Sequence, residues 1–289
     1  MDSPPRLRIG VIGAGRVGAV LGAALRAAGH NCVGVSAVSD LSRLRAEALL
    51  PNVEIKSADQ VVAESELVVL AVPDSVLPEL IRGFSVSGVF VPGQFVAHTS
   101  GNYGIGVFES APEVSPMAIH PAMTFTGTSV DLARIVDAPF GVTTTHTLRP
   151  VAEALVVEMG GEPIWVPEDA RAIYHTAMVL SSNYLNVLVN EAVSLLAESG
   201  MENPQRLLAP LLSASLDNAL RLGDKGLTGP IARGDTEVIH KHLEALADRP
   251  SSQNAYRALA KLATDRALGA GLLSIDQATE LFVELSERP

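Results

Sequence analysis

Three glycines near the start of the chain have the spacing of a loop that binds phosphate groups. Gly13, Gly15 and Gly18 follow the apolar run 7–12, typical of a buried strand, and precede the Ala- and Leu-rich stretch 19–28, which indicates a helix. In such a unit the first glycine permits the tight turn, the second lets backbone approach a pyrophosphate, and the third lets the helix pack on the strand. The free N–H groups of the helix N-terminus attract the anion. We therefore expect a dinucleotide site here, with a purely structural glycine turn as the alternative. Its predicted contacts are Gly13, Gly15, Arg16, Val17 and Gly18.

The residues after the second expected strand indicate which dinucleotide fits. An NAD-specific fold usually has an Asp or Glu about 20 residues past the glycines, where it holds the ribose hydroxyls. This chain has Ser36 there, followed by Ser39 and Arg43. Small hydroxyls and a guanidinium suit a 2′-phosphate, so we predict NADP. Asp40 keeps NAD possible, although Asp40 or Ser42 could simply cap the next helix.

Polar and small residues also follow the other expected strands. Ligands bind open α/β sheets beyond the carboxyl ends of the strands, so these positions are candidate contacts. We expect Val72 and Pro73 to flank the bridge between the two halves of the cofactor. His98 and Ser100 are candidate cofactor or substrate contacts, and His120 is a candidate substrate contact.

The secondary-structure elements that position these residues follow a pattern of hydrophobic residues that changes once along the chain. Up to residue 166, apolar strand-like runs alternate with helical stretches, and after Pro167 only helical patterns remain. This predicts an α/β fold with an N-terminal Rossmann dinucleotide-binding domain, 1–166, followed by an all-helical substrate and dimerisation domain, 167–289. Strands are expected at 7–12, 32–35, 67–74, 95–98, 117–121, 140–143 and 164–166. Helices of the second half are expected at 168–199, 205–222 with a division or kink at Pro210, 235–248, 253–268 and from a capping box at Ser274.

Composition excludes several classes of function. The net charge of -11 argues against a nucleic-acid surface and against an anionic membrane surface. Cys32 is the only cysteine, so no internal disulfide forms and a reducing cytoplasm is expected. The apolar stretch 177–197 carries Asn and Ser side chains and is interpreted as a bundle helix, not a membrane span. No Cys/His cluster or H-E-x-x-H pattern occurs, so no metal site is predicted.

Several motifs together resemble a known family. They are Gly13-Ala14-Gly15-Arg16-Val17-Gly18, His98-Thr99-Ser100-Gly101, His120-Pro121 with Phe125, Tyr174-His175 with Asn183, and Leu227-Thr228-Gly229-Pro230 with Arg233-Gly234-Asp235. The chain resembles proteins that join a Rossmann-like domain to the "domain of unknown function 2520". This family lies within the superfamily of 6-phosphogluconate dehydrogenase, β-hydroxyacid dehydrogenase and ketopantoate reductase. The resemblance implies an NAD(P)-dependent oxidoreductase.

The resemblance also points to a candidate proton donor. In β-hydroxyacid dehydrogenases a catalytic lysine lies sixteen residues before the Glu of a Glu-Ala pair, and the same count from Glu191 falls on His175. Histidine replaces lysine, but it can still donate a proton, since its usual pKa is about 6.5. Asn183 lies ~80° further round the same helix and could orient the substrate. The alternative for both side chains is a structural hydrogen bond in a helix interface.

Two further groups are also candidate substrate contacts. His120-Pro121 resembles the His-Pro pair of prephenate dehydrogenases, although the rest of that motif is absent. Thr228, Arg233 and Asp235 could close over the substrate, with Arg233 holding a carboxylate. The alternative is a Gly/Pro turn with an aspartate cap.

We therefore expect an NADP-dependent reductase acting on a small 2-oxo acid, ketopantoate-like by resemblance, or on an imine. One alternative is a non-catalytic dinucleotide-binding sensor or regulatory protein, which the replacement of lysine by His175 keeps open. Another is an enzyme of the prephenate or pyrroline-carboxylate type. The helices of the second half carry apolar residues on more than the one side that would face a core. Because large exposed apolar patches usually mark interfaces, a homodimer through that half is expected.

Overall fold

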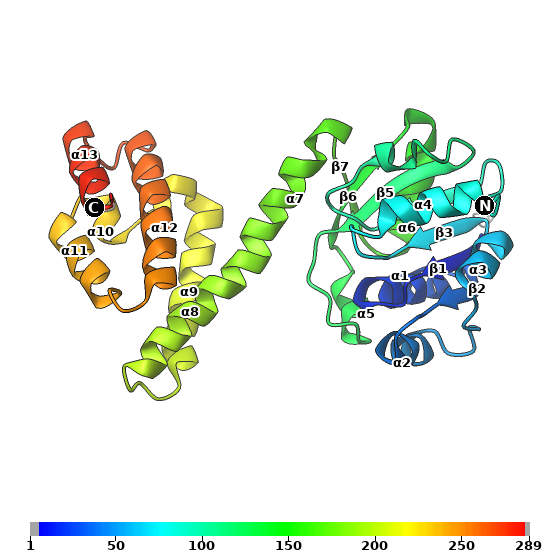
Figure 1. Ribbon diagram of the computed structural model, residues 1–289, viewed down its shortest axis with the longest axis horizontal. Coiled ribbons are helices and arrows are strands. Elements are labelled where there is room, and N and C mark those ends of the chain that lie inside the picture. The colour runs from blue at the N-terminus through cyan, green and yellow to red at the C-terminus, as the bar shows by residue number, and fades with distance from the viewer. Residues whose placement is uncertain (1–5, 287–289) are drawn as a thin grey trace. The chain divides into compact units, whose positions relative to one another are not determined.

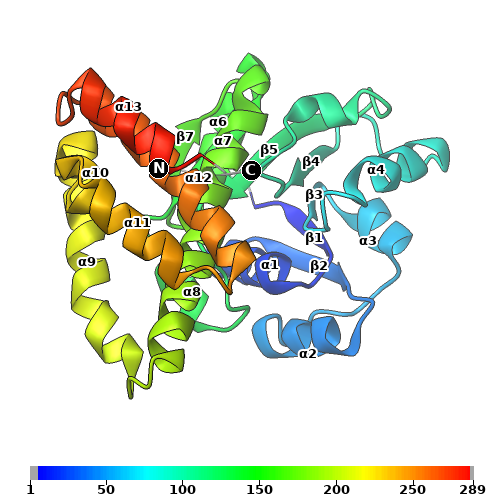
Figure 2. The same ribbon diagram turned by 60° about the vertical axis from the view of Figure 1, so that its left-hand side comes forward.

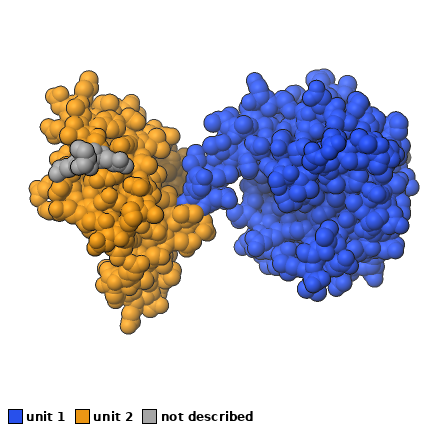
Figure 3. All heavy atoms as spheres, viewed as in Figure 1, with its two compact units in different colours: residues 1–184 blue, residues 185–289 orange. Residues whose placement is uncertain are grey.

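The computed structural model describes residues 6–286 and divides the chain into two compact units, 1–184 and 185–289 (Figures 1 and 3). Every expected strand is present in the first unit. The strands are β1 (Arg8–Ile12), β2 (Asn31–Ser36), β3 (Leu67–Leu70), β4 (Phe95–His98), β5 (Ser115–Pro121), β6 (Pro139–Thr144) and β7 (Glu162–Trp165). Whether the two folding domains divide at residue 166 stays a prediction.

The strands form one sheet with the order β2-β1-β3-β4-β5-β6-β7. Strands β1 to β5 are parallel, so their carboxyl ends meet at one edge. Strand β6 runs antiparallel to β5, pairing Gly141 with His120, and β7 is parallel to β6. The connection between β5 and β6, residues 122–138, contains the short helix α5 (Val130–Arg134).

Helices cover both faces of the sheet, which explains why strand β3 is apolar at every position. The helices of this unit are α1 (Arg16–Ala27), α2 (Asp40–Leu49), α3 (Ala58–Glu64), α4 (Leu77–Val86), α5 (Val130–Arg134), α6 (Arg149–Glu158) and α7 (Arg171–Val179). Leu67 and Val69 pack with α1 and α6 on one face, while Val68 and Leu70 pack with α3 and α4 on the other. The predicted α/β fold with a helical C-terminal region is confirmed.

The second unit is helical throughout its described part (Figure 2). It contains α8 (Leu185–Glu198), α9 (Pro204–Leu222), α10 (Gly229–Arg233), α11 (Thr236–Ala245), α12 (Pro250–Gly269) and α13 (Ile275–Glu284). Pro210 does not divide α9, which continues past it from Pro204 to Leu222. The capping box at Ser274 is present and begins α13. In the described residues, no helix is both long and apolar enough to cross a membrane.

Candidate active site

Two of the three glycines in the predicted cofactor loop are required by the fold itself. Gly13 has φ +95°, and a Cβ there would lie 2.5 Å from the carbonyl oxygen of Ala71. A Cβ on Gly18 would overlap the carbonyl oxygen of Gly13, so helix α1 could not approach the strand. Val72 lies directly against this turn, with its side chain 3.3 Å from the Cβ position of Gly13, and Pro73 follows it at the surface.

Gly15 differs, because nothing in the chain itself requires a glycine there. Its φ of -72° suits any residue, and a Cβ would meet no atom within 4 Å. The helix that begins after it has no side-chain cap and no acidic residue in its first turn. An open approach to an uncapped helix N-terminus fits a bound pyrophosphate, which would occupy the space that a side chain at Gly15 would fill. Arg16 and Val17 form the first turn of α1.

The predicted 2′-phosphate contacts lie at the end of β2 and the start of α2. The Ser36 carbonyl oxygen accepts hydrogen bonds from the N–H groups of Gly13 and Ala14, which ties the two loops together. Ser39, rather than Asp40 or Ser42, caps α2 by accepting a 3.2 Å hydrogen bond from the Ser42 N–H. Arg43 is exposed one turn further along.

A third guanidinium, which the sequence analysis did not select, lies beside this region. Gly127 packs so closely that a Cβ there would be 2.8 Å from Arg45 Nε and 3.1 Å from Arg16 Cα. The buried Asp131 carboxylate fixes the loop by accepting hydrogen bonds from the N–H groups of Thr126 and Gly127. The loop before α5 therefore packs against Arg16 and Arg45, close to the glycine turn.

His98 is the last residue of β4 and Ser100 follows it, but both side chains form hydrogen bonds within the protein. His98 is fully buried; its Nδ1 accepts from the Ser100 N–H, and its Nε2 lies 2.9 Å from the Gly104 carbonyl oxygen. The Ser100 hydroxyl accepts from the N–H groups of Asn102 and Tyr103. Burial lowers the pKa of His98 to about 4. These bonds fix the shape of the loop 99–104, and a ligand contact by either residue stays a prediction.

The three predicted catalytic side chains meet at one cavity. His120, His175 and Asn183 line a cavity of about 230 Å³ at the carboxyl end of β5. The two imidazole rings lie edge to face, with their centroids 6.0 Å apart. The remaining wall consists of Ala122, Met123, Thr124, Met178, Val179, Ser181 and Ser182. The cavity combines apolar walls with a few convergent polar groups, as small-molecule sites do.

Gly101 allows the two histidines to approach each other. A Cβ on this residue would lie 2.7 Å from His175 Cδ2 and 3.0 Å from His120 Nε2. Its place after the strand-end His98 was visible in the sequence, but its contact with two distant histidines was not.

Tyr174 and Arg171 support His120 from α7, and sequence reasoning missed the roles of both. The Tyr174 hydroxyl lies 2.8 Å from His120 Nδ1. Burial, together with the charges of His175, Arg171 and His98, lowers the pKa of His120 to about 4. His120 is therefore neutral at pH 7.

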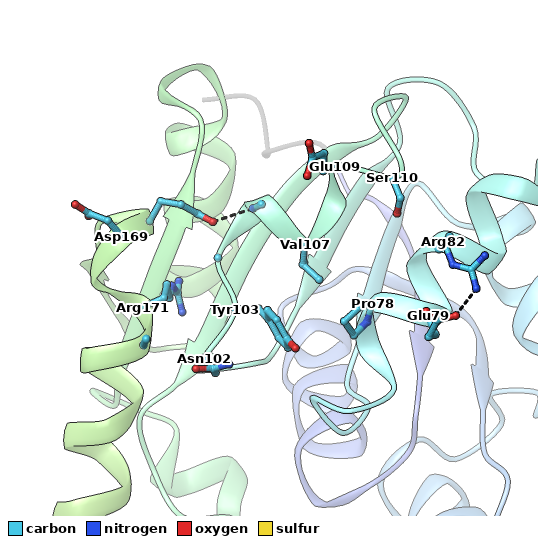
Figure 4. Close-up of a pocket in the computed structure, with 14 residues that line it drawn as sticks. Pro78, Glu79, Arg82, Asn102, Tyr103, Val107, Glu109, Ser110, Asp169 and Arg171 are labelled. Carbon is cyan, nitrogen blue, oxygen red and sulfur yellow. Dashed lines mark hydrogen bonds and ion pairs between the residues drawn. The ribbon is translucent and has the colours of Figure 1, made fainter.

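A larger cavity on the same unit contains none of the predicted residues. Its volume is about 710 Å³, and it lies between the start of α4, the loop 102–110 and the start of α7 (Figure 4). The Glu168 carboxylate there already accepts hydrogen bonds from the N–H groups of Ile105 and Gly106, and Glu79 pairs with Arg82. Size alone favours this cavity, but the convergence of histidines favours the smaller one as the reactive site.

Thr228, Arg233 and Asp235 belong to the second unit. Thr228 precedes α10, and Arg233 is the exposed last residue of that helix. Asp235 caps α11 by accepting from the Val238 N–H at 3.2 Å, as the aspartate-cap alternative predicted. Their contact with a substrate stays a prediction.

The fold and the glycine turn define a Rossmann-like protein. Residues 2–121 match the model of a Rossmann-like domain, and residues 138–263 match the model of the domain of unknown function 2520. The chain therefore combines these two domains, and the predicted resemblance to proteins with this combination is confirmed. No curated protein matches the sequence significantly.

Three solved structures illustrate the shared fold. A "putative NADP oxidoreductase" from Bacteroides fragilis is 24% identical with a TM-score of 0.74, over 89% of this chain and 98% of that one. An imine reductase from Pseudomonas sp. is 19% identical with a TM-score of 0.62, over 98% and 100% of the two chains. Pyrroline carboxylate reductase from Plasmodium falciparum, with NADP bound, is 13% identical with a TM-score of 0.56, over 90% and 98%. At these identities the likeness establishes the fold.

Proposed function

We propose that this protein is an NADP-dependent reductase of a small 2-oxo acid, ketopantoate-like, or of an imine. The observation that carries the proposal is the convergence of His120, His175 and Asn183 on one cavity. Because β1 and β5 are parallel strands of one sheet, this cavity lies at the same sheet edge as the open turn at Gly15. The names of the three similar structures support a dinucleotide-dependent reductase.

The reaction needs a proton donor and a group that polarises the reacting double bond. The bound cofactor would supply a hydride to the carbonyl or imine carbon. His175 would donate the proton to the oxygen or nitrogen, and Asn183 would orient the substrate by hydrogen bonds. His120 would donate a hydrogen bond to the same polar atom. A cavity of about 230 Å³ suits a substrate of a few carbon atoms.

NADP is the proposed cofactor, with NAD possible. Ser36, Ser39 and Arg43 are the proposed contacts of the 2′-phosphate, and Arg16 and Arg45, which lie against Gly127, would add positive charge. Guanidinium groups bind phosphate by charge-assisted hydrogen bonds, which supports this choice. Two of the similar structures are named for NADP or contain it.

We also propose a homodimer that forms through the helical unit, in the cytoplasm. Large apolar side chains of this unit are exposed, which is typical of an interface. They include Leu185, Val187, Leu188, Leu207, Leu211, Leu216, Leu220 and Leu222. A monomer mass in light scattering at micromolar concentration would contradict the dimer.

The function is tested by following the absorbance of NADPH. The reduced cofactor is supplied with small 2-oxo acids, with cyclic imines that carry no carboxylate and with pyrroline carboxylates, and the oxidised cofactor is supplied with prephenate, which a dehydrogenase oxidises. We expect turnover of one of the first two classes by the wild-type protein. Gly15→Val is the matched control, because its side chain would occupy the pyrophosphate space without straining the backbone, and it should neither bind nor oxidise NADPH. Turnover of only the last two substrates would favour the prephenate or pyrroline-carboxylate type. Tight NADPH binding with no turnover would favour a non-catalytic sensor or regulatory protein. His175 in the place of the catalytic lysine supports that alternative.

A further inference from the structure

Tyr174, which is not among the three predicted catalytic residues, forms a pair with one of them, His120. The Tyr174 hydroxyl lies 2.8 Å from Nδ1 of His120, and the two rings meet edge to face with centroids 5.6 Å apart. The other ring nitrogen, Nε2, lies on the side of Gly101 and His175. Tyr174 itself does not line the cavity.

The position of Tyr174 is held by the sheet and by a buried cation. A Cβ on Gly141 would lie 2.5 Å from the Tyr174 hydroxyl, so only glycine allows the ring to lie this close to β6. Below the ring, the Arg171 guanidinium carbon is 5.7 Å from the ring centroid. Arg171 is 2% exposed and donates to the Thr143 hydroxyl and to the carbonyl oxygens of Ala118 and Gly141.

The direction of the Tyr174–His120 hydrogen bond follows from the available donors and acceptors. Burial raises the pKa of Tyr174 above its usual value of 10, so the phenol keeps its proton at neutral pH. Its other polar neighbours, the Arg171 guanidinium and the Gly141 N–H, can only donate. His120 Nδ1 is the acceptor that remains among the described neighbours. Tyr174 therefore donates, and Nδ1 carries no proton.

We infer that Tyr174 is a positioning residue that fixes His120 as the neutral tautomer with its proton on Nε2. The partner of one ring nitrogen determines which tautomer is present. His120 then presents an N–H donor to the cavity for the carbonyl oxygen, imine nitrogen or carboxylate of the substrate. This inference rests on the proposed function only where it says that the Nε2–H group of His120 contacts a substrate. The tautomer of His120 is a property of the protein alone.

The charges around His120 support the same state. Arg171, Tyr174 and His175 face it from α7, and His98 faces it from β4. Burial, followed by the charges of His175 and Arg171, lowers the pKa of His120 to about 4, so His120 does not become a cation near pH 7. A neutral imidazole can polarise a carbonyl as a hydrogen-bond donor, and the proton then comes from His175.

The test compares Tyr174→Phe with the wild-type protein by nitrogen-15 NMR of the histidine side chains, with His120 assigned from His120→Gln. We expect a single Nε2–H tautomer in the wild type and a mixture of tautomers in Tyr174→Phe. With the substrate found above, kcat should fall on the order of tenfold, as for one lost neutral hydrogen bond, with a smaller change in KM.

The second unit offers a matched control. The Tyr256 hydroxyl lies 2.8 Å from His242 Nδ1, also with edge-to-face rings, so Tyr256→Phe removes the same kind of bond elsewhere. It should leave the His120 tautomer and kcat unchanged. If Tyr174→Phe does not fold, Gly141→Ala displaces the same hydroxyl and should give the same tautomer mixture.

The outcomes separate the two proposals. A single Nε2–H tautomer that survives in Tyr174→Phe and in Gly141→Ala overturns the positioning role, whatever happens to kcat. A wild-type spectrum with the proton on Nδ1 overturns it as well. If the tautomer becomes mixed but the wild-type protein reduces no substrate, the proposed function fails and the positioning role stands.

Discussion

Replacing Gly101 by alanine tests whether the contact between the two histidines matters for the reaction. The added Cβ would lie 2.7 Å from His175 Cδ2, whereas ordinary contacts begin at 3.4 Å. The His175 ring must therefore move by about 0.7 Å, the difference between these distances, and the His120 ring by about 0.4 Å from its 3.0 Å contact. A 1 Å displacement of a catalytic group can cost about 10²-fold, so we expect kcat to fall by roughly 10- to 10²-fold.

The stability of the variant should also fall, because overpacking typically costs about 1–3 kcal/mol. NADPH affinity, measured by fluorescence titration, should change little, because the glycine turn and α1 are untouched. Gly83→Ala is the control: Gly83 lies in α4, and a Cβ there meets nothing within 4 Å. That variant should keep its kcat and gain up to about 1 kcal/mol from helix propensity. A folded Gly101→Ala protein with wild-type kcat would mean that the chemistry does not use the paired histidines.

Other substitutions test separate parts of the site. His175→Gln should lower kcat by about 10²- to 10⁴-fold with unchanged NADPH affinity, and a near wild-type kcat would move the donor elsewhere. Asn183→Ala should raise KM as well as lower kcat in steady-state assays; a change in kcat alone would contradict its orienting role. Arg43→Ala should lose the preference for NADPH over NADH in paired titrations, and a retained preference would exclude Arg43 as the determinant. His98 has a folded-state pKa of about 4 against an ordinary value of 6.5, so between these pH values the unfolded chain binds a proton that the folded chain does not. Stability therefore falls as the pH drops through this window, and His98→Gln should reduce that fall by on the order of 3 kcal/mol in urea titrations; an unchanged slope would contradict this.

Local patterns were sufficient for the strands and for the glycine turn. Apolar runs such as 67–72 and the glycines at 13, 15 and 18 carry their structural reasons within a few residues of sequence. The helices α3, α4 and α5 were not predicted. For α3 and α5 the reason is their length, because seven and five residues show too little periodicity. The antiparallel direction of β6 was also not predicted, since alternation of strands and helices does not specify the direction of an edge strand.

The candidate site was only partly predictable, because its geometry depends on contacts between distant segments. His120 and Tyr174 are 54 residues apart in sequence, and the glycine that makes room for their bond lies on a third segment, at Gly141. No local pattern reports such a contact. Gly101 and Gly141 each lie against the ring of a candidate catalytic or positioning residue. The sequence alone could not distinguish these two glycines from ordinary turn glycines.

The helical segment after α7 explains how Asn183 reaches the same cavity as His175. In a regular α-helix, eight residues at ~100° each would leave Asn183 about 80° away from the face of His175. Residues Leu180–Tyr184 instead form a π-helical turn, in which each residue advances by a smaller angle because the hydrogen bonds span five residues. The smaller advance brings Asn183 back toward the face that lines the cavity. Such turns often occur at functional sites, and here the irregular turn brings the Asn183 amide to the cavity that the two histidines line. Because Arg171 holds the start of the same helix to β5 and β6 through its buried hydrogen bonds, the sheet fixes the placement of the whole row from Tyr174 to Asn183.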